Sequence, residues 1–344
     1  MKGRLIALDH LGGAEAAALL VDGRLDDLLI DSDRPRPGTI YRAIADRPVK
    51  GQGGMFLRTP EGPAFLRQVR GISPGQSLLV QVTGYAEPGK ALPVTGRILF
   101  KSRHAIVTPG APGLNVSRGI RDEARRDTLL EIAHEAIAGD WPDGETGLIL
   151  RSSCAETEAQ TIAEDIRAMM ALAAAVLGDA GGAVPEKLTE GDGPHALAWR
   201  DWTVPAQVVT TTGCFAEQGV LDLVEELRTP QVQLAGGAGM WVEPTRALVA
   251  VDVNTGGDTS PSAGLKANLA AAKDLPRQLR LRGLGGQVTV DFAPMPKKER
   301  PGVEAALRAA LRTDGVETTL VGWTPLGHYE LQRKRDRADL REVL

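Results

Sequence analysis

The sequence has few cysteines and no long apolar run. Its 344 residues include only two cysteines, Cys154 and Cys214, which excludes a disulfide framework. No C-x-x-C pair is present, so we expect no structural zinc, and buried free thiols in a reducing compartment are the simpler interpretation. No apolar stretch is long enough to cross a membrane, and residues 1–20 carry no apolar segment behind a basic start. We therefore expect a cytoplasmic protein with no membrane partner.

An excess of positive charge is also lacking. The net charge is −4 and the sequence pI is about 5.8, which excludes a protein that binds nucleic acid over its whole surface. Any such binding must use local basic patches. Candidates are residues 118–126 (RGIRDEARR), 297–300 and 333–335, for each of which the alternative is a solvated charged face. The length is sufficient for two or three small domains.

The stretch from Ala247 to Asp291 contains two short apolar runs, each with an acidic residue. Residues 247–253 and 287–291 are rich in Val and Ala, which predicts two strands carrying Asp252 and Asp291. A carboxylate inside an apolar run is costly to bury unless something pairs with it. Two such acids on neighbouring strands would face each other and need a cation, usually Mg²⁺ held by one or two carboxylates, waters and a substrate phosphate. Asn254 lies two residues beyond Asp252, so it points to the same face and can orient a phosphate or a water.

The residues between these two strands predict a helix. A turn at 255–258 precedes apolar residues at helical spacing, and glycines at 283, 285 and 286 end the helix. The order strand, helix, strand predicts two parallel and adjacent strands, which would bring Asp252 and Asp291 together. The alternative is that both are ordinary strand-end acids near a turn, because motif matches include false positives.

The remaining sequence predicts a hairpin, a small barrel and two helices. Asp22-Gly23 joins two apolar runs, which is a hairpin signal. Short apolar runs separated by Gly and Pro predict an OB-type barrel, a fold that binds oligonucleotides through a basic groove and aromatic stacking. These runs are residues 38–46, 53–59, 63–69, 76–85 and 91–98. Helices are expected at 121–138 and at about 156–177, with a strand at 147–150.

Four segments resemble the catalytic core of the ribonuclease E/G family. They are LAGGAG at 234–239, ALVAVDVN at 247–254, NLAAAKDLPRQLRLRGLGG at 268–286 and VDFAPM at 290–295. The resemblance implies a multi-subdomain fold of the α+β and α/β classes. Its expected parts are an RNase H-like subdomain split between 1–37 and 186–228, an OB-fold RNA-binding barrel at 38–98, a 5′-sensor subdomain at 99–185 and a DNase I-like catalytic subdomain at 229–344.

The resemblance also gives roles to particular residues. The family's two metal-binding aspartates fall on Asp252 and Asp291, and its active-site asparagine falls on Asn254. The base-contacting positions of the barrel fall on Met55 and Phe65. Met55 stands in place of a phenylalanine, so weaker base stacking is expected there, and the alternative role for Phe65 is plain barrel core.

Four more residues are expected to contact RNA. The groove lysine of the family's barrel falls on Lys90, and Arg118 begins the basic patch at 118–126. The 5′-phosphate pocket falls on Arg151 and Ser152, where Ser152 replaces the usual threonine and keeps the hydroxyl. Arginine can bind phosphate through two hydrogen bonds. Without the resemblance, Arg-Ser-Ser before a helix is an ordinary N-terminal cap.

The resemblance implies an endoribonuclease dependent on Mg²⁺, with Mn²⁺ as the alternative ion. It would cleave single-stranded, AU-rich RNA to 5′-phosphate and 3′-hydroxyl ends in RNA processing or decay. Two alternatives remain: a non-catalytic RNA-binding protein on the same scaffold, and a metal phosphoesterase acting on DNA or a small nucleotide. The sequence ends at Leu344, before the family's zinc-sharing segment and small dimerisation domain. The resemblance therefore predicts a short form that is a monomer or weak dimer, without the zinc-linked dimer.

Overall fold

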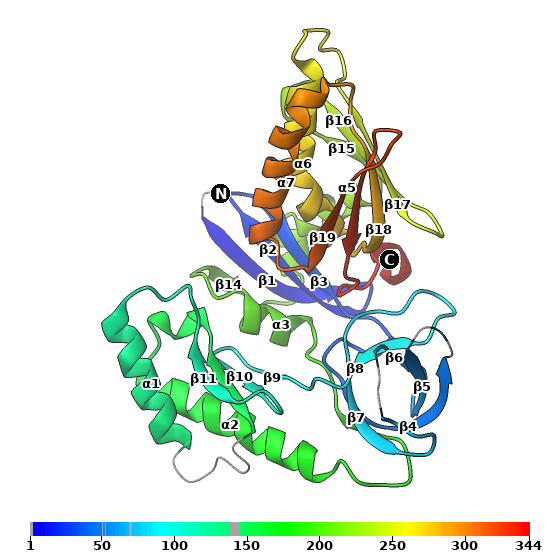
Figure 1. Ribbon diagram of the computed structural model, residues 1–344. Coiled ribbons are helices and arrows are strands. Elements are labelled where there is room, and N and C mark those ends of the chain that lie inside the picture. Colours follow the sequence, from blue (N-terminus) through cyan, green and yellow to red (C-terminus); the bar gives the residue numbers. More distant parts are fainter. Residues whose placement is uncertain (1–2, 50, 52, 69–70, 138–144) are drawn as a thin grey trace. The chain divides into compact units, whose positions relative to one another are not determined.

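A computed structural model describes residues 3–49, 51, 53–68, 71–137 and 145–344. The fold is mixed α/β and contains a closed five-stranded barrel (Figure 1). Internal contacts divide the chain into two compact units, Met1–Ser32 with Pro205–Leu344 (unit 1) and Asp33–Val204 (unit 2). The expected strand end at residue 69 and helix end at residue 138 lie outside the described residues. No helix in the described ranges has the length and hydropathy needed to cross a membrane.

Unit 1 contains a four-stranded sheet in the order β14–β1–β2–β3. The predicted hairpin is confirmed: Asp22 and Gly23 have φ angles of 51° and 79°, the left-handed pair whose twist suits an antiparallel turn. Helices α4 and α5 pack on this sheet through a core that includes Phe215 and Val224. The bounds are β1 (Arg4–Leu11), β2 (Ala14–Val21), β3 (Arg24–Ile30), β14 (Gln207–Val209), α4 (Cys214–Glu217) and α5 (Val220–Leu227).

The second sheet of unit 1 has the order β15–β16–β17–β18–β20–β19. Strands β17 and β18 are parallel and adjacent, as predicted, and α6 joins them. Helices α6 and α7 lie side by side against this sheet (Figure 1). The bounds are β15 (Gln231–Gln233), β16 (Gly239–Pro244), β17 (Val249–Asn254), α6 (Ala263–Leu281), β18 (Gly286–Asp291), α7 (Arg300–Thr313), β19 (Thr318–Trp323), β20 (Tyr329–Arg333) and α8 (Leu340–Val343), with 3₁₀ turns at Ala235–Gly237 and Lys297–Glu299.

Side chains alternate between the two faces of the second sheet. Val251, Val253 and Val290 are buried in the core shared with α6 and α7, because successive strand residues point to opposite faces. The intervening Asp252 and Asp291 are exposed on the other face. The helices therefore supply a dry core on one side and leave the acidic positions open to solvent on the other.

A buried charge network joins β3 to α6 and β20 within unit 1. The Arg333 side chain is 1% exposed and donates to Asp314 Oδ2 at 2.6 Å. Arg280 contacts the other oxygen of Asp314 and lies 3.3 Å from Asp27 Oδ1 on β3. Taking these charges out of water is costly, so removing one partner leaves an uncompensated buried ion. The network ties the hairpin sheet to the sheet that carries the acids.

The turn after α6 depends on a glycine. Gly283 has a φ of 65°, and a Cβ atom there would collide with the carbonyl oxygen of Ala338. The Leu284 amide donates to the Leu279 carbonyl at 2.8 Å, which closes the end of the helix. This turn returns the chain directly into β18, where Asp291 lies.

The barrel in unit 2 closes through β4–β5–β6–β8–β7 and the pairing of β7 back to β4. Its interior is filled by buried side chains including Tyr41, Leu57 and Val80. Strand β13, within the 186–228 stretch expected in the split subdomain, pairs here with β4. The bounds are β4 (Ile40–Val49), β5 (Gly54–Thr59), β6 (Gly62–Leu66), β7 (Ser77–Val82), β8 (Leu92–Thr95) and β13 (Glu186–Thr189).

The rest of unit 2 is a four-stranded sheet, β11–β12–β10–β9, packed against α1 and α2 (Figure 1). Leu148 and Leu150 of β12 share its core with Ile162 and Ile166 of α2. This packing fixes the end of the strand and therefore the backbone position of Arg151, the next residue. The bounds are β9 (Phe100–Lys101), β10 (Ala105–Thr108), β11 (Gly113–Val116), α1 (Glu123–Ile137), β12 (Gly147–Leu150), α2 (Ala159–Gly178) and α3 (Pro194–Asp201), with a 3₁₀ turn at Ser152–Ala155. The assignments of RNase H-like, 5′-sensor and DNase I-like subdomains stay predictions.

Candidate active site

Asp252 and Asp291 are direct neighbours across β17 and β18. The register pairs Asp252 with Asp291 in a parallel ladder, so both side chains leave the same exposed face. Asn254 lies on that face and its Nδ2 donates to Asp252 Oδ2 at 2.6 Å. The structure thus brings together the three residues that the sequence nominated for catalysis, while their roles stay predictions.

Two residues that the sequence did not indicate extend this row across the sheet. Trp241 of β16 lies opposite Asp252, and its ring is partly exposed. His328 directly precedes β20, and its Nε2 lies 3.8 Å from Asp291 Oδ1. Both follow from the register between strands, which the spacing of residues along one strand does not reveal. The order Trp241, Asp252, Asp291, His328 places an aromatic ring and an imidazole on either side of the two acids.

The acid pair fits a magnesium ion better than a structural zinc. Mg²⁺ keeps several waters and commonly uses one or two carboxylates together with substrate phosphate oxygens. The Asp291 side chain is 63% exposed, which leaves room for such ligands. Among the described residues, no group of three or more His, Cys, Asp or Glu side chains could hold a metal as a complete protein cage. A cavity of about 420 Å³ elsewhere in unit 1, lined by Leu227, Arg282 and others, includes neither acid.

The outer face of the barrel carries an aromatic pair. Phe56 of β5 lies opposite Phe65 of β6, with ring centroids 5.3 Å apart, and the Arg47 guanidinium lies 5.0 Å from the Phe56 centroid. A side chain at Gly54 would collide with the Phe65 ring, so glycine allows this ring to lie over the strand. Met55 is 4% exposed and belongs to the barrel core. Residue alternation therefore puts Phe56, and not Met55, beside Phe65.

Two of the predicted cationic contacts, Lys90 and Arg118, are exposed. Lys90 lies two residues before β8 and forms an ion pair with Glu87. Arg118 follows β11 in a turn beside the predicted phosphate pocket: a Cβ built at the adjacent Gly119 would lie 3.6 Å from Ser152 Cβ. Arg118, Arg151 and Ser152 thus come from two neighbouring turns at the ends of β11 and β12.

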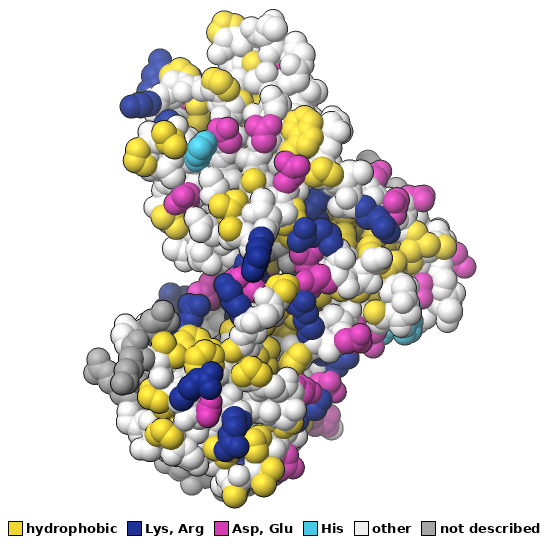
Figure 2. Space-filling model, turned by 90° about the vertical axis from the view of Figure 1, so that its right-hand side faces the viewer, with side chains coloured by type: hydrophobic (Ala, Val, Ile, Leu, Met, Phe, Trp, Pro, Cys, Tyr) yellow, Lys and Arg dark blue, Asp and Glu magenta, His cyan; other side chains and the backbone are white. Residues whose placement is uncertain are grey.

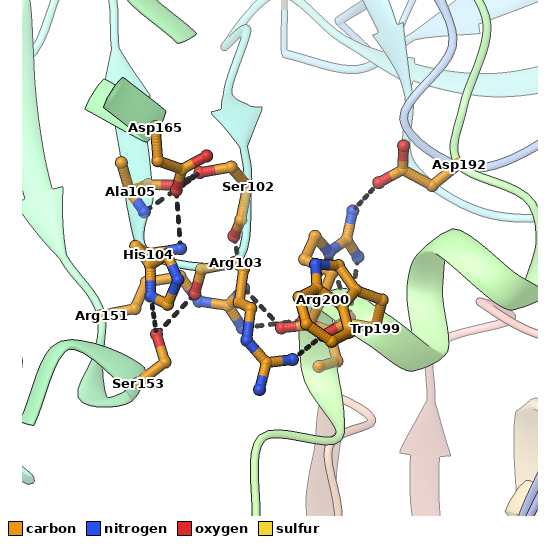
Figure 3. A network of polar contacts seen from close by, with 11 residues as sticks. Ser102, Arg103, His104, Ala105, Arg151, Ser153, Asp165, Asp192, Trp199 and Arg200 are labelled. Atoms are coloured by element: carbon orange, nitrogen blue, oxygen red, sulfur yellow. Dashed lines mark hydrogen bonds and ion pairs between the residues drawn. The ribbon is translucent and has the colours of Figure 1, made fainter. Parts of the chain in front are cut away.

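Arg151 is held in a polar network with the end of α3 (Figure 3). Its Nη1 donates to the carbonyl oxygens of Ser102, at 2.6 Å, and Arg200, at 3.2 Å, and its Nη2 lies 2.7 Å from Asp201 Oδ1. Burial acts to raise the pKa of Asp201, but hydrogen bonds and charge from Arg200 and Arg151 hold it below its usual value. Arg151 is therefore paired with an ionised carboxylate.

A buried histidine, His104, contacts the turn that carries Arg151. Ser153 Oγ donates to the Arg103 carbonyl at 2.6 Å and lies 3.1 Å from His104 Nδ1. Because a serine hydroxyl has one hydrogen, Nδ1 of His104 must carry the proton in this contact. Burial lowers the pKa of His104 below its usual value of about 6.5, against the opposing charge of Asp165. The neutral imidazole thus fixes Ser153, two residues from Arg151.

Charges of both signs are interspersed on the surface. On the face shown in Figure 2, Lys and Arg side chains (dark blue) and Asp and Glu side chains (magenta) are both spread over the surface. This agrees with the net charge of −4. Contacts to a polyanion would therefore depend on particular side chains such as those described above, and not on a general positive field.

Comparisons with known proteins point in one direction. The model of the Ribonuclease E/G family matches residues 100–207 and 203–336. Ribonuclease E of Nostoc sp. is 25% identical over 396 aligned residues, covering 98% of this chain and 56% of the relative. Ribonuclease G of Escherichia coli (strain K12) is 26% identical over 307 aligned residues, covering 78% of this chain and 62% of the relative. Ribonuclease G of Haemophilus influenzae is 26% identical over 393 aligned residues, covering 95% of this chain and 78% of the relative. The chain thus spans little more than half the length of several relatives.

Proposed function

This chain belongs to the ribonuclease E/G family, and we propose that it is a metal-dependent endoribonuclease that cuts single-stranded RNA. The observation that carries the proposal is the pairing of Asp252 with Asp291 on parallel strands, beside Asn254. Two carboxylates and an amide on an open face suit a long substrate, which can lie across the sheet without entering a closed pocket.

Asp252 and Asp291 would hold Mg²⁺, or Mn²⁺, with waters and a phosphate oxygen completing the coordination. When bound, the ion lowers the pKa of a water molecule and stabilises charge on the phosphoryl oxygens. The Asn254 amide donates to Asp252 and so fixes the direction of that carboxylate. Asn254 also lies where it can orient the scissile phosphate or the attacking water. Cleavage in this way gives a 5′-phosphate and a 3′-hydroxyl.

The barrel would bind the unpaired bases of the RNA. As a five-stranded closed barrel it matches the OB architecture, which binds oligonucleotides through a strand face and its loops. Phe65 keeps the stacking role expected from the sequence, and Phe56 takes the place that was expected for Met55, because Phe56 shares its face. Arg47 and the exposed Lys90 supply positive charge for the backbone.

Arg151 and Ser152 would bind a 5′-monophosphate, with Arg118 in the neighbouring turn. The Arg151 guanidinium is already oriented by the Ser102 and Arg200 carbonyls, so little side-chain entropy remains to be lost on binding. The exposed Ser152 hydroxyl can donate one further hydrogen bond to a phosphate oxygen. RNA with a 5′-hydroxyl lacks the charged group that these contacts require.

The test is a cleavage assay on a fluorescent, single-stranded, AU-rich RNA with and without Mg²⁺. The proposal predicts products with 5′-phosphate ends in the presence of Mg²⁺, none with EDTA, and faster cleavage of 5′-monophosphate than of 5′-hydroxyl RNA. Retained binding with no products in any metal would select the non-catalytic RNA-binding protein instead. Strong competition by single-stranded DNA would select a phosphoesterase with a broader substrate.

A further inference from the structure

One tryptophan beside Arg151 is exposed to solvent. Of the four tryptophans within the described ranges, Trp199 alone is exposed, at 67%. Single exposed apolar residues are common and need no explanation by themselves. Trp199 differs because a cation covers one side of its ring: the Arg103 guanidinium carbon lies 4.1 Å from the ring centroid. Arg103 Nη1 also donates to the Trp199 carbonyl oxygen, so the ring and the guanidinium are held together.

The stacked pair is continuous with the predicted phosphate pocket (Figure 3). The carbonyl oxygens that hold Arg151 belong to Ser102 and Arg200, which are the chain neighbours of Arg103 and Trp199. Arg151 therefore lies between the two segments that form the pair. The exposed Trp199 ring thus belongs to a segment that contacts Arg151 directly.

The charge around this pair also favours an anion. Arg200 is paired with Asp192 at 2.6 Å and with Asp201, and Asp201 is shared with Arg151. Among the described residues, Arg103 forms no ion pair with a carboxylate. Burial and the positive charge of Arg151 both lower the pKa of Arg103. Arg103 therefore offers a positive charge beside the ring that no described carboxylate neutralises.

We propose that Trp199, backed by Arg103, is a stacking platform for the first nucleobase of an RNA whose 5′-phosphate binds Arg151. This inference rests on the proposed function of Arg151. An exposed aromatic face stacks on any base, because every base has a π-face, and larger purines stack more strongly than pyrimidines. The Trp199 ring thus binds the terminal base, while Arg151 binds the 5′-phosphate of the same nucleotide.

The test measures binding of short 3′-labelled RNAs by fluorescence anisotropy in EDTA. The RNAs carry a 5′-monophosphate or a 5′-hydroxyl, and a 5′-terminal adenosine or an abasic ribose. The proteins are wild type, Trp199→Ala, Trp199→Phe, Arg151→Ala and Val184→Ala. Val184 lies in the same unit and is 68% exposed, so it controls for loss of an equally exposed apolar side chain.

The platform predicts that Trp199→Ala binds the 5′-monophosphate adenosine RNA about 5- to 150-fold more weakly, the range given by loss of one base–aromatic stack. Trp199→Phe and Val184→Ala should bind within about threefold of wild type. On abasic RNA, Trp199→Ala should bind as wild type does, because there is no base to lose.

Two results would overturn the platform. One is unchanged binding of the adenosine RNA by Trp199→Ala while Arg151→Ala loses its preference for the 5′-phosphate, which leaves the proposed pocket intact. The other is an equal loss on adenosine and abasic RNA, which makes Trp199 a purely structural residue. No dependence on Arg151 or on the 5′-phosphate would overturn the pocket itself, and absence of RNA binding would overturn both.

Discussion

At the scale of single side chains, the two faces of β5 separate Met55 from Phe56. We expect Phe56→Ala to weaken single-stranded RNA binding by about 5- to 150-fold, because it removes one of the two paired rings on the outer face. Fluorescence anisotropy with an RNA that has a 5′-hydroxyl isolates this contribution from that of Arg151. Met55→Leu is the matched control: it conserves core volume and should leave RNA binding unchanged. A larger loss of RNA affinity for Met55→Leu than for Phe56→Ala would mean that Met55, and not Phe56, contacts the RNA.

The carboxylate of Asp201 competes with a phosphate for Arg151. We expect Asp201→Asn to bind 5′-monophosphate RNA about two- to fivefold more tightly, since it removes a partly exposed negative charge 2.7 Å from the guanidinium. Affinity for 5′-hydroxyl RNA should not change. Asp192→Asn provides the control, because Asp192 contacts Arg200 but not Arg151 and has similar exposure. Weaker binding by Asp201→Asn would mean that this carboxylate orients Arg151 for the substrate.

Burial of His104 predicts a dependence of stability on pH. Its lowered pKa means that the unfolded chain binds a proton more readily than the native state. The contribution of neutral His104 to the free energy of unfolding is therefore fully present above about pH 6.5, the usual histidine pKa. It is lost as the pH falls through the lower native pKa. We expect the urea midpoint of wild type to fall between pH 7 and pH 5 by more than that of His104→Gln. His134→Gln, at an exposed histidine of α1, should retain the wild-type dependence, and the same slope in all three proteins would refute the account.

At the scale of secondary-structure elements, the buried network around Asp314 holds α6, β20 and the hairpin sheet together in unit 1. We expect Asp314→Ala to reduce the free energy of unfolding by about 3–5 kcal/mol, because Arg333 is left buried without its partner. Urea unfolding followed by circular dichroism measures this change. Glu225→Ala removes a surface pair with Arg228 and should cost less than about 1 kcal/mol. Equal effects would show that the buried pair adds no more than a surface pair.

The strands, helices and parallel pairing around the acids could be predicted because their signals are local. The Val-rich runs, the glycines after α6 and the Asp-Gly turn each point to one structure, and the start of α1 and both ends of α2 lie within a few residues of expectation. The pairing of Phe56 with Phe65 and the positions of Trp241 and His328 could not be predicted, because they depend on cross-strand register and on which face of a strand is buried. Pairing of β13 with the barrel likewise joins residues about 145 positions apart and has no local signal.

The Trp199 platform escaped prediction for a related reason. Arg103, Arg151 and Trp199 lie in three separate segments, and each is unremarkable in its own sequence context. Only the fold of unit 2 brings the end of α3 against the turns after β9 and β12. Sequence patterns identify such groups when the residues share one element, as Asp252 and Asn254 do on β17.

At the scale of the whole molecule, the two units carry different parts of the proposed activity. Unit 1 carries the acid pair, and unit 2 carries the aromatic barrel face and the Arg151 network. We propose that the acid pair of unit 1 forms the cleavage site for the RNA that unit 2 binds. Cleavage and binding should therefore be separable by substitution of an acid in unit 1.

The most direct measurement compares wild type with Asp252→Asn for both Mg²⁺-dependent cleavage and RNA affinity. Asparagine has nearly the same shape, and position 252 is exposed, so the fold should be retained. We predict that Asp252→Asn loses cleavage by at least about a hundredfold, because an amide is a poor substitute for a carboxylate ligand of Mg²⁺, while its RNA affinity in EDTA stays within about threefold of wild type. Cleavage by Asp252→Asn at the wild-type rate would contradict the account and place the chemistry elsewhere.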